Sequence, residues 1–152
     1  MYFFHYTSED NHQTMTLGTP WNCEARQPQK GVWYSDQHEV GFYVTGLAPS
    51  QMTEKKARKT GGGGKSGEYV LVFSFDVRAK DFSGASKSVN LEQGIRIKLV
   101  GQPVKFALTP FGKDPEGKRV PFAQAMCMWS GPVENCPEHF ANDDNVLKSL
   151  YS

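Results

Sequence analysis

Two short stretches of this sequence hold the side chains that could do chemistry. The first, Tyr2 to Ser8, begins with aromatic residues and ends in His, Tyr, Thr and Ser. The second, residues 41–49, reads Gly-Phe-Tyr-Val-Thr-Gly-Leu-Ala-Pro. Aromatic and β-branched runs of this kind are typical of short strands that leave the core at one end. Since each run places a histidine or a tyrosine near an end, the two predicted strands could form one cleft.

His5 and Tyr43 are the candidate chemical groups of this cleft. A histidine ring offers a directional hydrogen bond, and a tyrosine offers a flat apolar face with a polar tip. Each also has an ordinary structural explanation, because a backbone group can satisfy a core histidine and tyrosine is common in strands. Their occurrence together at this separation favours a shared site.

The sequence Phe4-His5-Tyr6-Thr7-Ser8, followed by Gly-x-Tyr-x-Thr-x-Leu-x-Pro over 41–49, resembles a family of ADP-ribosyltransferase toxins. That family has a His-Tyr-Asp signature and is a small branch of the diphtheria-toxin-like transferases. The motifs cover the first third of the chain. The resemblance implies an α+β fold, with a split, mostly antiparallel pair of sheets and short helices enclosing an NAD cleft. It also implies NAD as co-substrate and a macromolecular acceptor, with a protein as the first expectation.

The resemblance assigns roles to residues of both motifs. His5 would hydrogen-bond the adenosine-side ribose of NAD, and Tyr43 would stack on the nicotinamide. Tyr6, Thr7 and Ser8 would line the site, with the backbone of Tyr6 or Thr7 contacting the nicotinamide amide. Transfer from NAD requires mostly that the substrate is held and its developing charge stabilised, which suits residues of these types.

The acidic residue of the signature has no clear counterpart. The family pattern has Asp after Tyr-x-Thr, where this sequence has Gly46. A second alignment places residues 32–36 on the motif, which supplies Asp36 but puts Trp33 where a tyrosine is expected. Tyr34, in the same run, is counted with the expected NAD-binding residues, although Trp33 and Tyr34 fit core positions equally well.

Glu92 is a further candidate for the acid. It precedes the alternating run 95–100, and related transferases place a catalytic Glu or Gln at the entry of such a strand. Glu92 ranks above Asp36, although an acid beside an exposed strand is usually only solvated. A chain that lacks the acid would be a relative that binds without turnover.

Composition indicates one strand-rich domain. With 152 residues the chain can bury a substantial core, and its 15 glycines and 9 prolines imply many turns. A net charge of +1 gives no field for nucleic acid or for an anionic membrane. Neither a secretory signal nor a transmembrane stretch is apparent, so a cytoplasmic protein and a delivered effector both remain open.

The three cysteines, Cys23, Cys127 and Cys136, form no metal-ligand pattern with the four histidines. We therefore expect no metal site. A disulfide between Cys127 and Cys136 is conceivable in an oxidising compartment, and three reduced thiols are the alternative.

The elements that must position the site follow from the apolar patterns. Strands are predicted at 2–8, 31–35, 41–45, 68–77, 95–100 and 104–108, with 68–77 the strongest and placed in the middle of a sheet. A hairpin of 106–111 with 119–128 and a capped terminal helix from residue 142 are also predicted.

Residues 55–67 are predicted to form a flexible, basic, Gly-rich surface loop. Gly64-Lys65-Ser66 resembles the end of a phosphate-binding loop, but Lys59 stands where that motif needs glycine. Three hypotheses follow from the whole sequence: an ADP-ribosyltransferase effector, a silent relative that binds a nucleotide or a protein, and an unrelated secreted β-rich interaction domain.

Overall fold

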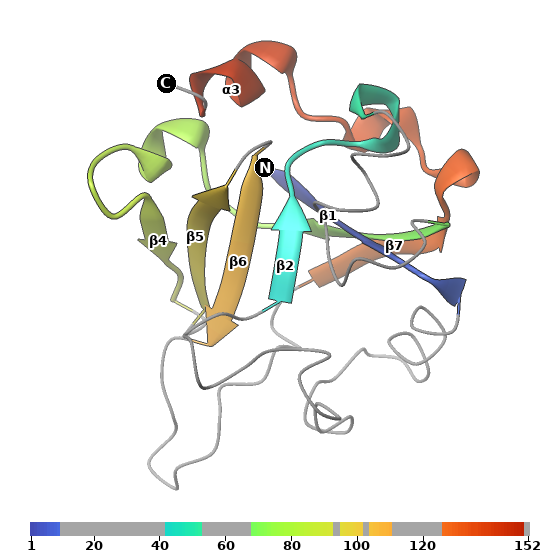
Figure 1. Ribbon diagram of the computed structural model, residues 1–152, viewed down its shortest axis with the longest axis horizontal. Helices are drawn as coiled ribbons and strands as arrows, with labels where there is room; N and C mark the ends of the chain where they lie inside the picture. Colours follow the sequence, from blue (N-terminus) through green and yellow to red (C-terminus); the bar gives the residue numbers. More distant parts are fainter. Residues whose placement is uncertain (10–41, 53–67, 93–94, 102–103, 111–125, 151–152) are drawn as a thin grey trace, which may run out of the picture.

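The computed structural model describes residues 1–9, 42–52, 68–92, 95–101, 104–110 and 126–150 (Figure 1). The strands are β1 (Tyr2–Thr7), β2 (Phe42–Thr45), β3 (Tyr69–Ser74), β4 (Ser88–Asn90), β5 (Ile95–Gly101), β6 (Lys105–Pro110) and β7 (Met126–Pro132). Short 3-10 turns span Pro49–Gln51, Ala79–Phe82, Val133–Asn135 and Glu138–Phe140, and the helix α3 spans Asp144–Ser149. The expected strand at 31–35 and the basic loop at 55–67 lie outside the described residues.

The strands form one sheet in the order β4-β5-β6-β2-β1-β3-β7, and every pairing among the described residues is antiparallel. In Figure 1, β4, β5, β6 and β2 stand side by side, while β1 and β7 run across them at a steep angle. The predicted mixed α+β, mostly antiparallel fold is therefore confirmed. The sheet is continuous, however, and not the expected pair of separate sheets.

The two halves of the sheet meet at β1 and β2. Here the described pairing has Phe4 opposite Thr45, whereas β1 pairs with β3 along its whole length from Tyr2 to Thr7. The weak connection between β1 and β2 lets the sheet fold over, so that its two halves face each other.

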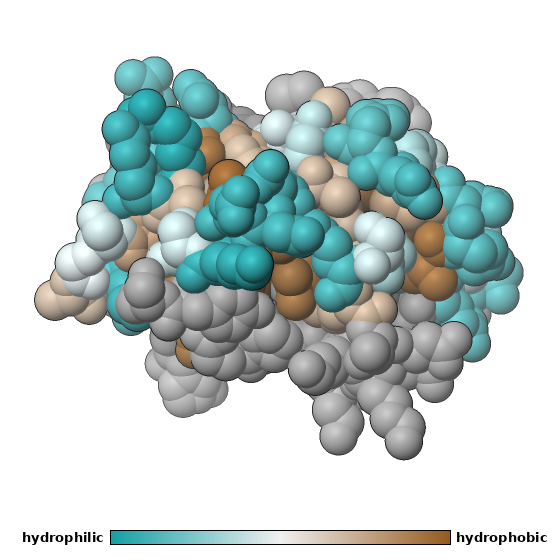
Figure 2. Space-filling model, turned by 90° about the horizontal axis from the view of Figure 1, so that it is seen from above, coloured by the Kyte–Doolittle hydropathy of each residue, from teal (hydrophilic) through white to brown (hydrophobic). Residues whose placement is uncertain are grey.

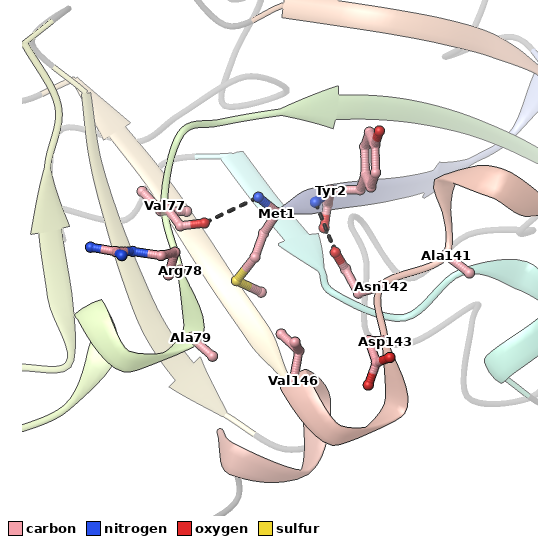
Figure 3. A pocket seen from close by; sticks show the side chains of 9 residues that line it. All are labelled: Met1, Tyr2, Val77, Arg78, Ala79, Ala141, Asn142, Asp143 and Val146. Atoms are coloured by element: carbon pink, nitrogen blue, oxygen red, sulfur yellow. Dashed lines mark hydrogen bonds between the residues drawn. The ribbon is translucent and has the colours of Figure 1, made fainter.

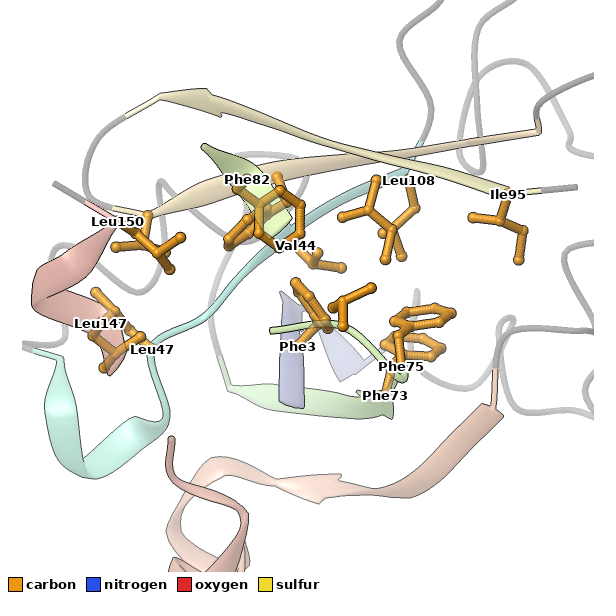
Figure 4. Close-up of a cluster of buried hydrophobic side chains, with 14 of the residues drawn as sticks. Phe3, Val44, Leu47, Phe73, Phe75, Phe82, Ile95, Leu108, Leu147 and Leu150 are labelled. Carbon is orange, nitrogen blue, oxygen red and sulfur yellow. The ribbon is translucent and has the colours of Figure 1, made fainter. Parts of the chain in front are cut away.

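The larger core lies between these halves (Figure 4). Phe3 packs edge-on against Phe106, with ring centroids 5.0 Å apart and an interplanar angle of 86°. Val44 and Leu108 are also fully buried there. Because side chains alternate along a strand, Phe4 and Tyr6 point to the other face of β1, where they form a second core with Val70, Val72 and Phe140.

The C-terminal segment fastens the start of β1 to the end of β2. The side-chain amide of Asn142 donates to the carbonyl oxygens of Tyr2 and Gly46, at 2.9 and 2.8 Å, and its oxygen accepts from the Tyr2 amide at 3.0 Å. Asp143 then caps α3 by accepting from the Asn145 amide. The predicted capped helix is confirmed, with Leu147 buried beneath it.

Two predictions about strand pairing can be compared with the structure. The predicted hairpin of 106–111 with 119–128 lies largely outside the described residues; within them, β6 pairs with β5 and β2, and β7 pairs with β3. The strand β3 is interior but lies next to the outermost strand β7, so it is not the middle of the sheet. Its fully buried Val70 and Phe73 result from cores on both of its faces.

Candidate functional site

His5 lies at the point where the two halves of the sheet separate. Its side chain is only 4% exposed, and its Nδ1 atom is 2.7 Å from the carbonyl oxygen of Tyr43. A carbonyl oxygen can only accept, so this contact requires the proton on Nδ1. The ring of His5 therefore joins β1 to β2 just beyond the paired Phe4 and Thr45. The two residues singled out in the sequence motifs are neighbours in space.

The ring of Tyr43 does not take part in this contact. Val44 belongs to the core between the halves, so alternation places the Tyr43 side chain on the opposite, outer face of β2. The ammonium group of Lys105 lies there, 4.3 Å from the centroid of the Tyr43 ring, which is a cation–π distance. The His5 side chain, in contrast, is on the core face of β1, between the side chains of Phe3 and Thr7.

The other residues of the first motif differ in their surroundings. Tyr6 is 1% exposed and donates a hydrogen bond of 2.8 Å from its hydroxyl to the carbonyl oxygen of Leu47. Its side chain is thus held in the second core, and Tyr6 is paired with Val70 in the β1–β3 ladder. Thr7 is buried at the end of β1, and Ser8 is half-buried just after it.

Gly46 explains why the signature acid is absent from this position. A Cβ atom at Gly46 would lie 3.2 Å from side-chain atoms of both Leu147 and Val104, which is tighter than an ordinary contact. The carbonyl oxygen of Gly46 also accepts from Asn142. A carboxylate here would enter an apolar core without a partner, so the position is structural.

The remaining acid candidates are not gathered around His5 in the described residues. Glu92 is exposed in the connection between β4 and β5. Since β6 and β2 stand between β5 and β1, Glu92 is on the far half of the sheet. Asp36 and Tyr34 lie outside the described residues.

Two residues at the Thr7 end of β1 were missed in the sequence. Tyr69 is opposite Thr7 in the β1–β3 pairing, and its hydroxyl donates to the carboxylate of Glu9, which follows the end of β1. Partial burial and then the charge of Glu9 raise the pKa of Tyr69 above its ordinary value, with smaller effects from Glu134 and Glu68. Local patterns could not have identified this pair, because Tyr69 simply opens the strongest strand and only the strand register brings it beside β1.

A pocket of about 360 Å³ lies at the opposite end of β1 (Figure 3). It is lined by Met1, Tyr2, Val77, Arg78, Ala79, Ala141, Asn142, Asp143 and Val146. The Met1 amino group donates to the carbonyl oxygens of Phe75 and Val77, and the Asn142 amide is engaged as described above. These groups support the fold, and the pocket is separate from the His5 region.

The described surface and the Cys136 thiol offer few further groups that could bind a ligand or do chemistry. The face shown in Figure 2 carries small apolar areas interrupted by hydrophilic side chains. Cys136 is a free thiol whose burial raises its pKa. Among the described residues no group of His, Cys, Asp and Glu could hold a metal ion. None of the helices in the described ranges has the length and apolar character needed to cross a membrane.

The chain matches no protein-family model, and comparisons with curated proteins and with solved structures give no significant match.

Proposed function

We propose that this protein is an NAD-dependent ADP-ribosyltransferase, a toxin-like effector that transfers ADP-ribose from NAD to a protein. The observation that carries the proposal is the 2.7 Å contact between the ring of His5 and the backbone of Tyr43. This contact joins the two strands that hold the transferase-like motifs, at the place where the sheet halves separate. NAD would bind at this meeting point of the two strands.

In the proposed reaction the bond between C1′ of the ribose and N1 of the nicotinamide breaks. Its electron pair leaves with the nicotinamide, which becomes neutral, and the ribose becomes an oxocarbenium-like cation. A lone pair of the acceptor then forms the new bond at C1′, and the acceptor loses a proton to solvent. The protein contributes by holding NAD in a reactive conformation and by stabilising the positive charge. His5 would hydrogen-bond a ribose hydroxyl in this arrangement.

The second candidate is a silent relative that binds NAD without turnover. Gly46 favours this alternative, because the position of the signature acid is closed by Leu147 and Val104. A chain that kept the binding residues and lost the acid would bind NAD and release no nicotinamide.

The test is to incubate the purified protein with NAD and a cell lysate as acceptor source, and to measure nicotinamide release and NAD binding. We compare wild type with His5→Ala and with His139→Ala, since His139 is exposed in the turn Glu138–Phe140. Circular dichroism and thermal unfolding check that each variant folds.

The transferase is supported if wild type and His139→Ala release nicotinamide and a folded His5→Ala releases at least tenfold less. A decrease of about tenfold corresponds to the loss of one transition-state hydrogen bond. Saturable NAD binding without release supports the silent relative. A wild-type protein that does not bind NAD and does not release nicotinamide overturns the NAD proposal.

A further inference from the structure

We infer that Tyr69, and not the ring of Tyr43, provides the aromatic face for the nicotinamide beside His5, and that Glu9 provides the carboxylate. This inference rests on the proposed function. It supplies the acid that the sequence motif lacks.

The strand register places Tyr69 close to His5. His5 is opposite Leu71 and Thr7 is opposite Tyr69, so His5 and Tyr69 are diagonal neighbours. Such neighbours lie about 7–8 Å apart, within reach of an aromatic side chain. Leu71 belongs to the core between the sheet halves, so alternation puts Tyr69 on that same face of β3. Phe3, His5 and Thr7 occupy the matching face of β1.

The side chains on this shared face change from apolar to polar along the strands. Phe3 and Phe73 pack in the core, His5 and Leu71 follow, and Thr7 and Tyr69 form the last cross-strand pair. Tyr69 is half-buried and Glu9 is exposed, so both lie at the edge of the core and not inside it. A ligand that entered between the halves at this end would meet Tyr69 and Glu9 before it met His5.

Glu9 acts on the Tyr69 hydroxyl through its charge and through a side-chain hydrogen bond, so its carboxylate lies near this edge. A carboxylate held beside an aromatic ring suits the nicotinamide end of NAD, which is a flat cation before the bond breaks. The same carboxylate would stabilise the positive charge that develops on the ribose. Glu9 is therefore the residue expected to act on the reacting atoms, and Tyr69 is both a stacking surface and a positioning residue for Glu9.

Tyr43 is less suited to this role. Its ring is on the outer face of β2, where the Lys105 ammonium group already occupies one side of it. A nicotinamide stacked there would lie on the other side of the sheet from the His5 ring. The cation of Lys105 would also repel the positively charged ring of NAD.

The experiment measures steady-state nicotinamide release and NAD binding for the whole chain. The variants are Glu9→Gln, Glu9→Asp and Tyr69→Phe, with Glu134→Gln as the control. Glu134 is an acid that also acts on Tyr69 but does not follow β1. These substitutions are at exposed or half-buried positions, so the variants should fold.

We expect Glu9→Gln to lower kcat by about 100-fold with KM within about threefold of wild type, since the lost charge acts mainly in the transition state. Glu9→Asp should restore part of the rate, and Tyr69→Phe should lower kcat by about tenfold. The Glu134→Gln control should keep kcat within about threefold. A wild type that releases nicotinamide, with Glu9→Gln equally active, overturns this inference alone. A wild type that neither binds NAD nor releases nicotinamide overturns the proposed function as well.

Discussion

The hydroxyl of Tyr6 is a polar group inside an apolar core. It donates to the carbonyl oxygen of Leu47 at 2.8 Å, and Tyr6 also packs with Phe4 and Phe140 in the second core. In Tyr6→Phe the ring stays but the Leu47 carbonyl loses its partner. We expect the free energy of unfolding at pH 7 to fall by about 1–2 kcal/mol, measured by urea denaturation.

The pH dependence of stability gives a second readout of the same hydroxyl. Burial, and then the neighbouring Cys136, raise the pKa of Tyr6 above its ordinary value of 10.0. Above pH 10 the unfolded chain therefore loses this proton while the folded chain keeps it, so the wild type becomes less stable as pH rises. Tyr6→Phe lacks this loss, and its stability deficit should shrink above pH 10. Parallel stability curves for the two proteins from pH 8 to pH 11 would contradict the argument.

Single residues show where sequence patterns were informative about the site. The type and position of His5 and Tyr43 were enough to predict that they lie together, because both belong to short strands with clear patterns. Which way the Tyr43 ring points, and that Tyr69 is diagonal to His5, depend on strand register. Register is set by contacts between distant parts of the chain, and no local pattern in this sequence encodes it.

At the scale of elements, Asn142 connects three parts of the fold. Its side chain makes three hydrogen bonds, to both backbone groups of Tyr2 and to the carbonyl oxygen of Gly46. In Asn142→Asp the carboxylate can no longer donate, and it faces two carbonyl oxygens in a site where Asn142 is 9% exposed. We expect Asn142→Asp to lower the free energy of unfolding by about 3 kcal/mol or more, measured by thermal and chemical denaturation at pH 7.

Asn145→Ala is the matched control, because the Asn145 side chain is exposed in α3 and its backbone amide still reaches the cap. Its stability should stay within about 0.5 kcal/mol of wild type. Equal losses in Asn142→Asp and Asn145→Ala would show that the hydrogen bonds of Asn142 do not fasten the C-terminal segment to the sheet.

Elements with a strong local pattern were predictable, and their partners were not. The strand β5 was found because apolar and polar residues alternate, and Ile95 and Ile97 are indeed buried. The strand β4 was missed because it is short and polar at the outermost position of the sheet. The described partners of β6 are β5 and β2, and β2 is far away in the sequence, so no local pattern could have identified it as a partner.

At the scale of the whole molecule, hydrophobic contacts hold the two halves of the sheet together, because the β1–β2 pairing is too short to do so. Phe3 comes from one half and Phe106 from the other, and both are fully buried. Phe106 also packs against Phe82, with centroids 5.0 Å apart. This contact fixes the position of β1, and therefore of His5, relative to the half of the sheet that contains β6.

The interaction of Phe3 with Phe106 can be measured by a double-mutant cycle. We expect Phe3→Leu and Phe106→Leu each to be destabilising, with a coupling free energy of about 0.5–1.5 kcal/mol from the edge-to-face contact. Because this core joins the halves, both should unfold together, and curves from far-ultraviolet circular dichroism and tryptophan fluorescence should coincide. With Trp21 and Trp33 replaced by Phe, the fluorescence of Trp129 in β7 reports on the half that contains β1, while circular dichroism reports on all strands. Two separate transitions in the wild type would mean that the halves are stable independently, and a coupling energy of zero would mean that the Phe3–Phe106 contact does not hold them together.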